Sequence, residues 1–268
     1  MPRIPCPRCR SKIGYAMKTG YRRCSSCRYD WHPNRMPLRL SKSQWKDVLV
    51  WFARGQSAKA ISEETRLDRL RIIRALMYVR KAMKTDIPEQ FSGIVEVDET
   101  YMGGQWKNKR KKVRAKGTKR GRGTSKQPVF GIYARNGIVW AELVDDAEAA
   151  TLQPLIKKQV RKGSVVCSDT WKGYTGIAIQ GYVHRLVEHG KGEYSDCRGT
   201  HINGLEGFWG YLKRKLAAKG GIRRERLDLY LAEYVWRYNH RKLPADDQVK
   251  KLLALLRNRR IFGVGSDT

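Results

Sequence analysis

The order in which strand-like and helix-like patterns follow one another after residue 90 limits the possible folds of this chain more than any other feature. Alternating β-branched residues predict a strand at residues 94–98, and Asn136-Gly137 is typical of a tight hairpin turn. The expected strands are 94–98, 129–134, 138–144, 164–167 and 182–187, and the expected helices are 146–161, 201–218 and 224–241. A hairpin followed by alternating strands and helices predicts an α/β (α+β) fold in which helices cover a mixed sheet.

Two Cys-x-x-Cys pairs, Cys6 with Cys9 and Cys24 with Cys27, dominate residues 1–36. This segment has few aliphatic residues, so it cannot bury a core without a metal ion. In a reducing compartment such pairs are typical of metal ligands rather than of disulfides. We therefore expect a zinc ribbon in which a structural Zn²⁺ ion binds the four thiolates. Four thiolates leave no open coordination position, which argues against a catalytic zinc ion.

Residues 37–88 have the pattern of three helices with a tight turn between the second and the third. Ser41 and Ser57 are expected to cap the first two helices, and residues 68–83 are expected to form the third. The expected apolar side of the third helix is Leu70, Ile73, Leu76, Met77 and Val79, and its basic residues are Arg69, Arg71, Arg74, Arg80, Lys81 and Lys84. The pattern predicts a helix-turn-helix-like DNA-binding domain, and its plain alternative is a three-helix bundle with a solvated basic face.

The charge of the chain predicts a polyanionic partner. It has 56 Lys and Arg residues against 25 Asp and Glu residues, a formal charge of +31. Such an excess favours nucleic acid or an anionic membrane surface as the partner. Because no apolar run approaches about 18 residues and no signal-peptide core is present, we expect no membrane span and a cytoplasmic location. Residues 104–127 form a basic insertion without an apolar pattern, which we expect to be a flexible arm that binds phosphate.

Three widely spaced acids carry the chemistry expected of the C-terminal part. Asp98 ends the first strand of that part and Asp169 follows its next central strand, so the two carboxylates should lie side by side. Glu206 lies on a helical pattern with Asn203 and Lys213 on the same face. Oxygen ligands suit Mg²⁺ or Mn²⁺, and two such ions support phosphoryl transfer. The plain alternative for each acid is a turn-forming or solvated side chain.

Three motifs resemble the catalytic motifs of bacterial insertion-sequence DDE transposases. They are Glu96-Val97-Asp98-Glu99-Thr100-Tyr101-Met102-Gly103-Gly104, Ser168-Asp169-Thr170-Trp171-Lys172-Gly173-Tyr174, and His201-Ile202-Asn203-Gly204-Leu205-Glu206-Gly207-Phe208-Trp209 followed by Leu212-Lys213-Arg214. With its cysteine pairs, the chain is similar to the family numbered fifteen ninety-five, which has an N-terminal zinc ribbon and an ISXO-type transposase domain. The resemblance implies a ribonuclease-H-like catalytic domain over residues 89–268. Asp98, Asp169 and Glu206 would be its metal-binding acids, and Lys213 the basic residue that follows them.

The resemblance also leaves two residue roles open. Some members of the family have Asn as the third catalytic residue, and this chain has both Asn203 and Glu206. A carboxylate is the stronger ligand of a divalent ion, so we expect Glu206 to be the ligand and Asn203 an auxiliary contact. Trp209 is expected either to pack in the core or to stack on an unpaired base near the cleavage site.

By this resemblance the chain is a transposase that acts on double-stranded DNA. It would bind the terminal inverted repeats of its own element, cleave the 3′ ends with two Mg²⁺ or Mn²⁺ ions and join them to target DNA. We expect it to be associated with the nucleoid and to act as a homodimer or larger assembly on paired ends. Two alternatives stay open: a sequence-specific DNA-binding protein, and a metal-dependent nuclease without strand transfer.

Overall fold

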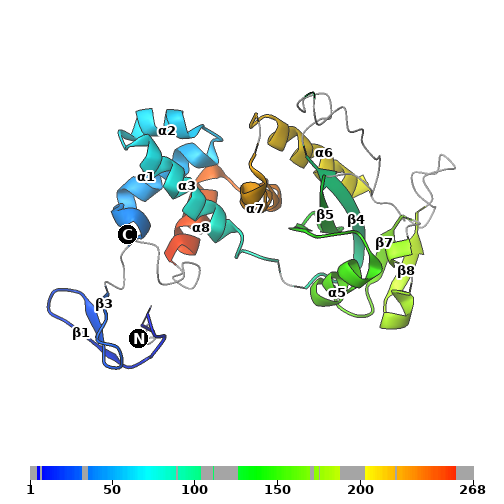
Figure 1. Ribbon diagram of the computed structural model, residues 1–268, viewed down its shortest axis with the longest axis horizontal. Helices are drawn as coiled ribbons and strands as arrows, with labels where there is room; N and C mark the ends of the chain where they lie inside the picture. Colours follow the sequence, from blue (N-terminus) through cyan, green and yellow to red (C-terminus); the bar gives the residue numbers. More distant parts are fainter. Residues whose placement is uncertain are drawn as a thin grey trace. The chain divides into compact units, whose positions relative to one another are not determined.

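The chain folds into two compact units in the computed structural model, which describes residues 5–6, 8–31, 36–88, 90–103, 111, 126–169, 172–174, 176–187, 203–220 and 222–257 (Figure 1). Residues 1–86 and 242–268 form one unit, called here the N-terminal unit, and residues 87–241 form the other, the sheet unit. Most of the predicted basic insertion, and Trp171, lie outside the described residues. Within the described ranges, no helix combines the length and apolar character needed to cross a membrane.

The N-terminal unit begins with a small antiparallel sheet in the order β1-β2-β3. Its strands are β1 (Gly14–Ala16), β2 (Arg22–Cys24) and β3 (Asp30–Trp31). Cys6, Cys24 and Trp31 form its only described core cluster, with Cys27 packed against them. On β2 and β3, Arg23 and Asp30 form two hydrogen bonds of 2.7 Å each. A core this small agrees with the expectation that a metal ion must stabilise the segment.

Three helices follow as the sequence predicts, after a short 3-10 helix η1 (Pro37–Arg39). They are α1 (Lys42–Ala53), α2 (Ala58–Thr65) and α3 (Arg69–Met83). The Ser41 side chain caps α1 in a capping box with Gln44, and Ser57 caps α2, so both predicted caps are confirmed. Arg66 has a left-handed φ of 55° in the turn between α2 and α3.

The predicted apolar side of α3 is wrong for Leu70, which is 63% exposed. Leu76 and Val79 are buried as predicted, and Ile73 and Met77 are partly buried. The helix also buries the apolar residues Ile72, Ala75, Ala82 and Met83. The predicted and the observed buried sets both have the spacing of a helix face, so periodicity alone could not choose between them. The consequence is an exposed apolar side chain at the start of α3.

A fourth helix of the N-terminal unit comes from the far end of the chain. This helix, α8 (Ala245–Arg257), buries Val249, Leu252 and Leu256 and packs against α1 and α3 (Figure 1). Lys251 on α8 lies 3.7 Å from the Asp86 carboxylate. The sequence-based division ended the helical domain at residue 88 and extended the catalytic domain to residue 268; the structure groups α8 with the helices that precede the sheet unit.

The sheet unit contains a mixed five-stranded sheet in the order β6-β5-β4-β7-β8. The strands are β4 (Ile94–Met102), β5 (Gln127–Ala134), β6 (Val139–Leu143), β7 (Val165–Ser168) and β8 (Val183–Leu186). β5 is antiparallel to β4 and β6, whereas β7 is parallel to β4 and to β8. In sequence terms the spatial order is third, second, first, fourth, fifth. This is the ribonuclease-H-like arrangement, so the predicted fold class is confirmed.

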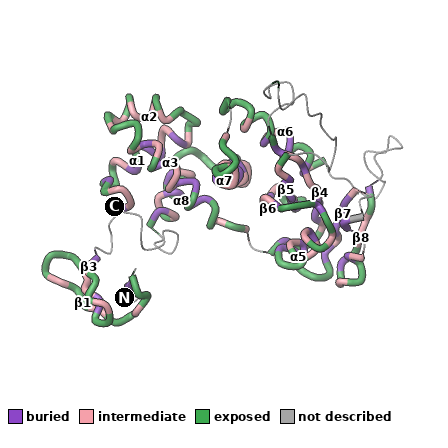
Figure 2. The backbone as a smooth tube through the Cα atoms, in the orientation of Figure 1, coloured by how far each residue is buried: buried purple, intermediate pink, exposed green. Residues whose placement is uncertain are grey.

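Helices cover both faces of this sheet (Figures 1 and 2). One face packs with α5 (Ala149–Gln159), and the other with α6 (Asn203–Ala217) and α7 (Leu227–Asn239), which follows the 3-10 helix η7 (Arg224–Arg226). Two further 3-10 helices, η4 (Lys172–Tyr174) and η5 (Ala178–Gln180), lie between β7 and β8. Side chains alternate along a strand, so Val95 and Val97 face α5, and Glu96 and Asp98 face α6.

Candidate functional site

Asp98 and Asp169 lie just beyond the paired segment of two neighbouring parallel strands. Ile94 pairs with Val165 and Glu96 with Cys167. Asp98 and Asp169 each follow the last paired residue of their segment by two positions, and the negative charge of Asp169 acts on the Asp98 carboxyl. The sequence placed Asp98 at the end of its strand, but β4 continues to Met102, so that prediction is wrong. The pairing with β7, however, stops at Glu96. Both carboxylates therefore follow directly after the point where the two strands cease to pair.

The surroundings of Asp98 disfavour its negative charge. Burial raises the pKa of the Asp98 carboxyl to about 7, and the negative charges of Glu99 and Asp169 add to this shift. Tyr174 on η4 is fully buried and donates a hydrogen bond of 2.7 Å to Glu99 Oε2. Burial and the charges of the three acids raise the pKa of Tyr174 well above its ordinary value. A site with this excess of negative charge favours a cation.

The indole of Trp209 connects α6 to Asp98. Its Nε1–H donates a hydrogen bond of 3.0 Å to Asp98 Oδ2, and the side chain is only 4% exposed. Gly131 on β5 lies opposite Asp98, and a Cβ at that position would approach the indole to 2.6 Å. Of the two roles expected for Trp209, the structure therefore supports core packing, and the glycine makes room for it.

Glu206, Asn203 and Lys213 are exposed on α6. A helix turns about 100° per residue, so Glu206 and Lys213 project within about 20° of each other, on the side that also carries Trp209. The structure does not gather the three predicted acids into a compact cluster. Among the described residues, only one group of three or more His, Cys, Asp or Glu side chains is compact enough to share a metal ion, and it consists of cysteines.

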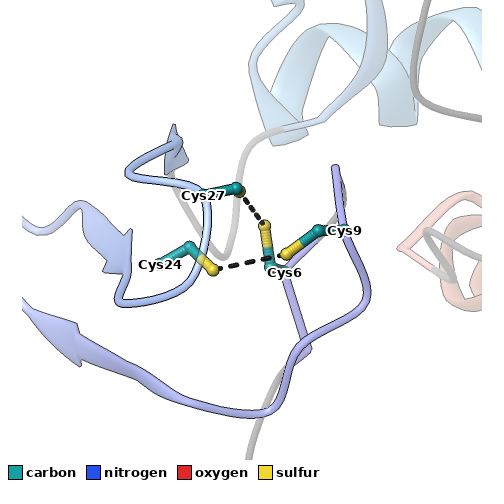
Figure 3. A group of neighbouring side chains, drawn as sticks. All are labelled: Cys6, Cys9, Cys24 and Cys27. Carbon is teal, nitrogen blue, oxygen red and sulfur yellow. Dashed lines mark hydrogen bonds between the residues drawn. The ribbon is translucent and has the colours of Figure 1, made fainter.

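That group is the one predicted from the sequence: Cys6, Cys9, Cys24 and Cys27 (Figure 3). All four Sγ atoms lie within 4.8 Å of one another, and the cysteines are free rather than disulfide-bonded. The Sγ atoms of Cys6 and Cys27 are 3.6 Å apart, and those of Cys9 and Cys24 are 3.5 Å apart. A tetrahedral zinc site with bonds of about 2.3 Å separates its sulfurs by about 3.8 Å. The cluster therefore fits zinc.

The pKa values of these thiols also indicate that a cation belongs between them. A hydrogen bond from the Cys27 backbone lowers the pKa of the Cys24 thiol to about 6. The Ser11 backbone favours the Cys9 thiolate, but burial and the other three cysteines together raise the pKa of Cys9 to about 12. One thiolate therefore opposes the ionisation of its neighbour. A bound divalent ion removes this opposition, because it stabilises all the thiolates at once.

The basic residues of α3 divide into two groups. Arg71 donates hydrogen bonds to the backbone oxygens of Leu38 and Arg39, and Arg80 is buried, so neither presents a free basic side chain. The exposed basic side chains are Arg69, Arg74, Lys81 and Lys84, and Leu70 is exposed beside them. The predicted DNA-contact face is therefore narrower than the sequence suggested.

Sequence reasoning missed the roles of Glu96 and Tyr174. Glu96 is a fully buried carboxylate in an otherwise apolar stretch of β4, two residues from Asp98 and on the same face. The alternation of side chains along the strand could have drawn attention to it. Tyr174 could not have been found in this way, because its contact with Glu99 depends on how η4 packs against the sheet.

Comparisons with known sequences give one family match and two relatives with transposition-related descriptions. Residues 90–239 match the sequence profile of the ISXO2-like transposase domain. An uncharacterized transposase-like protein of Haemophilus influenzae is 30% identical over 115 residues, which are 43% of this chain and 92% of that protein. An uncharacterized protein in transposable element ISH50 of Halobacterium salinarum is 24% identical over 269 residues, which cover 93% of this chain and 90% of that protein.

Two solved structures are distantly similar to the chain. The Mos1 transposase paired-end complex with left transposon end is 14% identical, with a TM-score of 0.28 over 83% of this chain and 80% of that one. The simian T-cell lymphotropic virus intasome in complex with the PP2A regulatory subunit B56 gamma is 12% identical, with a TM-score of 0.34 over 72% and 68%. Because these sequence identities and TM-scores are low, the assignment of the fold rests on the strand order and pairing of the sheet and not on these superpositions.

Proposed function

The chain belongs to the ISXO2-like transposase family, and on that premise we propose that it cleaves the 3′ ends of an insertion sequence and joins them to target DNA. The observation that carries this proposal is the proximity of Asp98 and Asp169, which each lie two residues beyond the last pair of the parallel strands β4 and β7 and whose charges interact. Two carboxylates placed side by side at the point where strands separate are suited to bind divalent cations. The net charge of +31 supports DNA as the substrate.

We assign the metal ligands to Asp98, Asp169 and Glu206. These carboxylates would hold Mg²⁺ or Mn²⁺, which when bound would activate the attacking oxygen and stabilise the leaving oxygen of an in-line displacement at phosphorus. The protein residues do the positioning. Trp209 holds Asp98 Oδ2 by its N–H group, and Lys213 lies on the same side of α6 as Glu206, where its ammonium group can attract a phosphate.

We assign DNA recognition to the N-terminal unit. The exposed residues at the start of α3 are Arg69, Leu70 and Arg74. Arginine side chains pair with guanine edges in the major groove, and an apolar side chain contacts the methyl group of thymine. These residues would read the terminal inverted repeat, with the zinc ribbon and the basic insertion 104–127 adding phosphate contacts.

The first experiment separates chemistry from binding. Asp98→Ala, Asp169→Ala and Glu206→Ala should each abolish Mg²⁺-dependent cleavage of a labelled repeat-end duplex, because each removes a metal ligand. DNA affinity should change less than about threefold, since exposed arginines and lysines supply it. Glu142→Ala, which removes an exposed acid on β6, is the matched control and should leave cleavage unchanged. Cleavage that persists in the Asp98 and Asp169 variants would refute the proposal.

The third ligand needs its own comparison. If Glu206 is the ligand, Glu206→Ala should eliminate cleavage, whereas Asn203→Ala should only reduce it. Cleavage retained in Glu206→Ala and lost in Asn203→Ala would transfer the role to Asn203. Both residues are exposed on α6, so neither substitution should unfold the chain.

The same assay distinguishes the alternatives. A supercoiled target plasmid added with the repeat-end duplex reports strand transfer, which appears as labelled plasmid. Cleavage without labelled plasmid would indicate a nuclease, and binding without cleavage would indicate a DNA-binding protein.

We further propose that the active species is a homodimer or larger assembly on paired ends. One catalytic site acts on one DNA end at a time, and both ends of an element must be inserted together. Light scattering of the protein on repeat-end DNA should give at least two chains per paired complex. Concerted joining of both ends by a complex with one chain would contradict this assignment.

A further inference from the structure

Glu96 is a buried charge that needs an explanation. Its side chain is completely inaccessible to solvent, and burial of a carboxylate is costly unless polar groups compensate for it. Oε2 accepts a hydrogen bond of 2.9 Å from the Leu205 backbone N–H in the first turn of α6. Oε1 lies 3.4 Å from Nε of Arg135. The N–H groups of the first turn of a helix have no partner within the helix, and the helix dipole favours a negative charge there.

Glu96 and Asp98 together bind α6 at two points. Leu205 donates to Glu96 and Trp209 donates to Asp98. Residues two apart on a strand are separated by about 6.7 Å. Residues four apart on a helix are separated by about 6 Å along the axis. The backbone spacings of the two pairs are therefore similar, and the two hydrogen bonds hold two successive turns of α6 to β4.

The glycines at this contact let the helix come close to the sheet. Tyr133 lies opposite Glu96 on β5, and a Cβ on Gly204 would overlap its ring, at 2.3 Å from the nearest carbon. Gly131 lies opposite Asp98 and leaves room for the Trp209 indole in the same way. Each carboxylate contact of α6 is thus paired with a glycine that permits it.

We propose that Glu96 is a positioning residue which, through the first turn of α6, sets the place of the third metal ligand relative to Asp98. Glu206 follows Leu205 directly, so a shift of the Leu205 backbone moves the Glu206 carboxylate with it. This inference rests on the proposed function, because it takes Glu206 as the third ligand. It gives a role to a fully buried residue of β4 that is not itself assigned as a metal ligand.

The contact itself can be tested without catalysis. In Glu96→Ala, amide hydrogen exchange in the first turn of α6 should be at least about tenfold faster than in the wild type, because a hydrogen bond to a charged group is lost. Glu96→Gln keeps an acceptor oxygen and should restore part of the protection. Ile132→Ala is the matched control, since Ile132 is buried in the core on the opposite face of the same sheet. Equal exchange in the first turn of α6 in Glu96→Ala and Ile132→Ala would overturn the proposal.

The consequence for the site is tested by kinetics on repeat-end DNA. Glu96→Ala should lower kcat for cleavage by about 10- to 100-fold, the usual cost of misplacing a catalytic group by about 1 Å. KM for DNA should stay the same, and Glu96→Gln should recover part of kcat. If kcat falls no more in Glu96→Ala than in Ile132→Ala, Glu96 only stabilises the fold, and the proposal is refuted.

A double substitution identifies the residue through which Glu96 acts. If it acts through Glu206, Glu96→Ala combined with Glu206→Ala should bind Mn²⁺, measured by electron paramagnetic resonance, no more weakly than Glu206→Ala alone. Additive losses in Mn²⁺ affinity would mean that Glu96 acts elsewhere. If Glu206→Ala alone keeps full cleavage, the proposed third ligand is wrong, whereas altered exchange in Glu96→Ala would still show that the carboxylate anchors α6. The two proposals therefore fail in different ways.

Discussion

Asp98 is largely buried in the fold, which disfavours its ionised form, whereas the proposed role as a metal ligand requires that form. Its carboxyl lies on the central strand, accepts hydrogen bonds from the Trp209 indole and the Glu99 backbone, and faces the charges of Glu99 and Asp169. In the absence of a divalent ion its carboxyl therefore keeps its proton up to a pH of about 7, well above the ordinary range of an aspartic acid. A cation at this position would reverse that preference, since it stabilises the ionised form.

This preference gives Asp98 a predictable effect on stability. The folded-state pKa of Asp98, about 7, lies above its ordinary value of 3.8. The contribution of Asp98 to the free energy of unfolding is therefore fully present below pH 3.8 and is lost as the pH rises towards 7. At 1.36 kcal/mol per pKa unit the loss is at most about 4 kcal/mol. Without added Mg²⁺, Asp98→Asn should therefore be more stable than the wild type at pH 8 and similar to it near pH 4. Urea unfolding at both pH values measures the difference in the free energy of unfolding. A wild type that becomes more stable relative to Asp98→Asn as the pH rises would contradict the prediction.

Gly131 provides a second test at single-residue scale. Gly131→Ala places a Cβ at 2.6 Å from Trp209, so the indole must move away from Asp98. We expect a loss of about 1–3 kcal/mol in the free energy of unfolding, as for other overpacked cores. Gly207→Ala on α6 is the control, because nothing lies within 4 Å of the added Cβ. The free energy of unfolding of Gly207→Ala should increase by about 0.5–1 kcal/mol, because alanine has a better helix propensity than glycine. The denaturant midpoints of Gly131→Ala and Gly207→Ala should therefore shift in opposite directions.

At the scale of elements, α7 is hydrogen-bonded to the edge of the sheet by its last residue, Asn239. The Asn239 amide accepts a hydrogen bond from the Val139 N–H and donates one to the Val139 oxygen, both 2.8 Å long. It thus pairs with the outer edge of β6 as a neighbouring strand would, and satisfies backbone groups that would otherwise need water. Arg241 extends the contact, with a hydrogen bond of 3.0 Å to the Gly137 oxygen in the hairpin turn.

The zinc ribbon is the element whose stability should depend on a single ion. Its described core is limited to cysteines and Trp31, so removal of zinc should unfold residues 1–36 and leave the sheet unit folded. Near-ultraviolet and far-ultraviolet circular dichroism after dialysis against a chelator should show a partial change that zinc reverses. Thiol titration should then find four newly reactive cysteines. A ribbon that keeps its structure without metal would disprove the assignment.

Elements defined by local patterns were predictable from the sequence, and contacts between distant elements were not. The caps at Ser41 and Ser57 and the succession of strands and helices along the chain follow from neighbouring residues, and the expected proximity of Asp98 and Asp169 was inferred from that succession. The contact of Glu96 with Leu205 joins residues far apart in the chain, and it depends on a register that no local pattern specifies. The role of α8 was missed for the same reason, since its partners α1 and α3 lie at the other end of the sequence.

At the scale of the whole molecule, the sheet unit interrupts the N-terminal unit in the chain. Residues 87–241 separate α3 from α8, although α8 buries its apolar side against α1 and α3. The helix-turn-helix-like part of the molecule therefore obtains part of its core from beyond the sheet unit.

A chain that stops after Arg241 should lose this core. Burial of Val249, Leu252 and Leu256 contributes about 1.5–3 kcal/mol for each side chain, a sum comparable to the stability of a small domain. We expect the truncated chain to lose affinity for repeat-end DNA and to show rapid amide exchange in α1 and α3, while the sheet unit stays protected. Lys251→Ala in the full chain is the control, since it removes only the partly exposed ion pair with Asp86 and should cost less than about 1 kcal/mol. Unchanged DNA affinity after truncation would show that α8 is dispensable.

The position of α8 also sets the moment during synthesis at which the helices around α1 and α3 can complete their core. A ribosome adds about 5–20 residues per second, so α8 emerges roughly 8–30 s after α3 has been made. Throughout that interval the growing chain carries an unfinished helical core, and the whole sheet unit is translated before the interval ends. A message cut short anywhere inside the sheet unit therefore yields neither a complete helical core nor a complete sheet unit. Only a ribosome that reads through α8 releases a chain in which both units are finished.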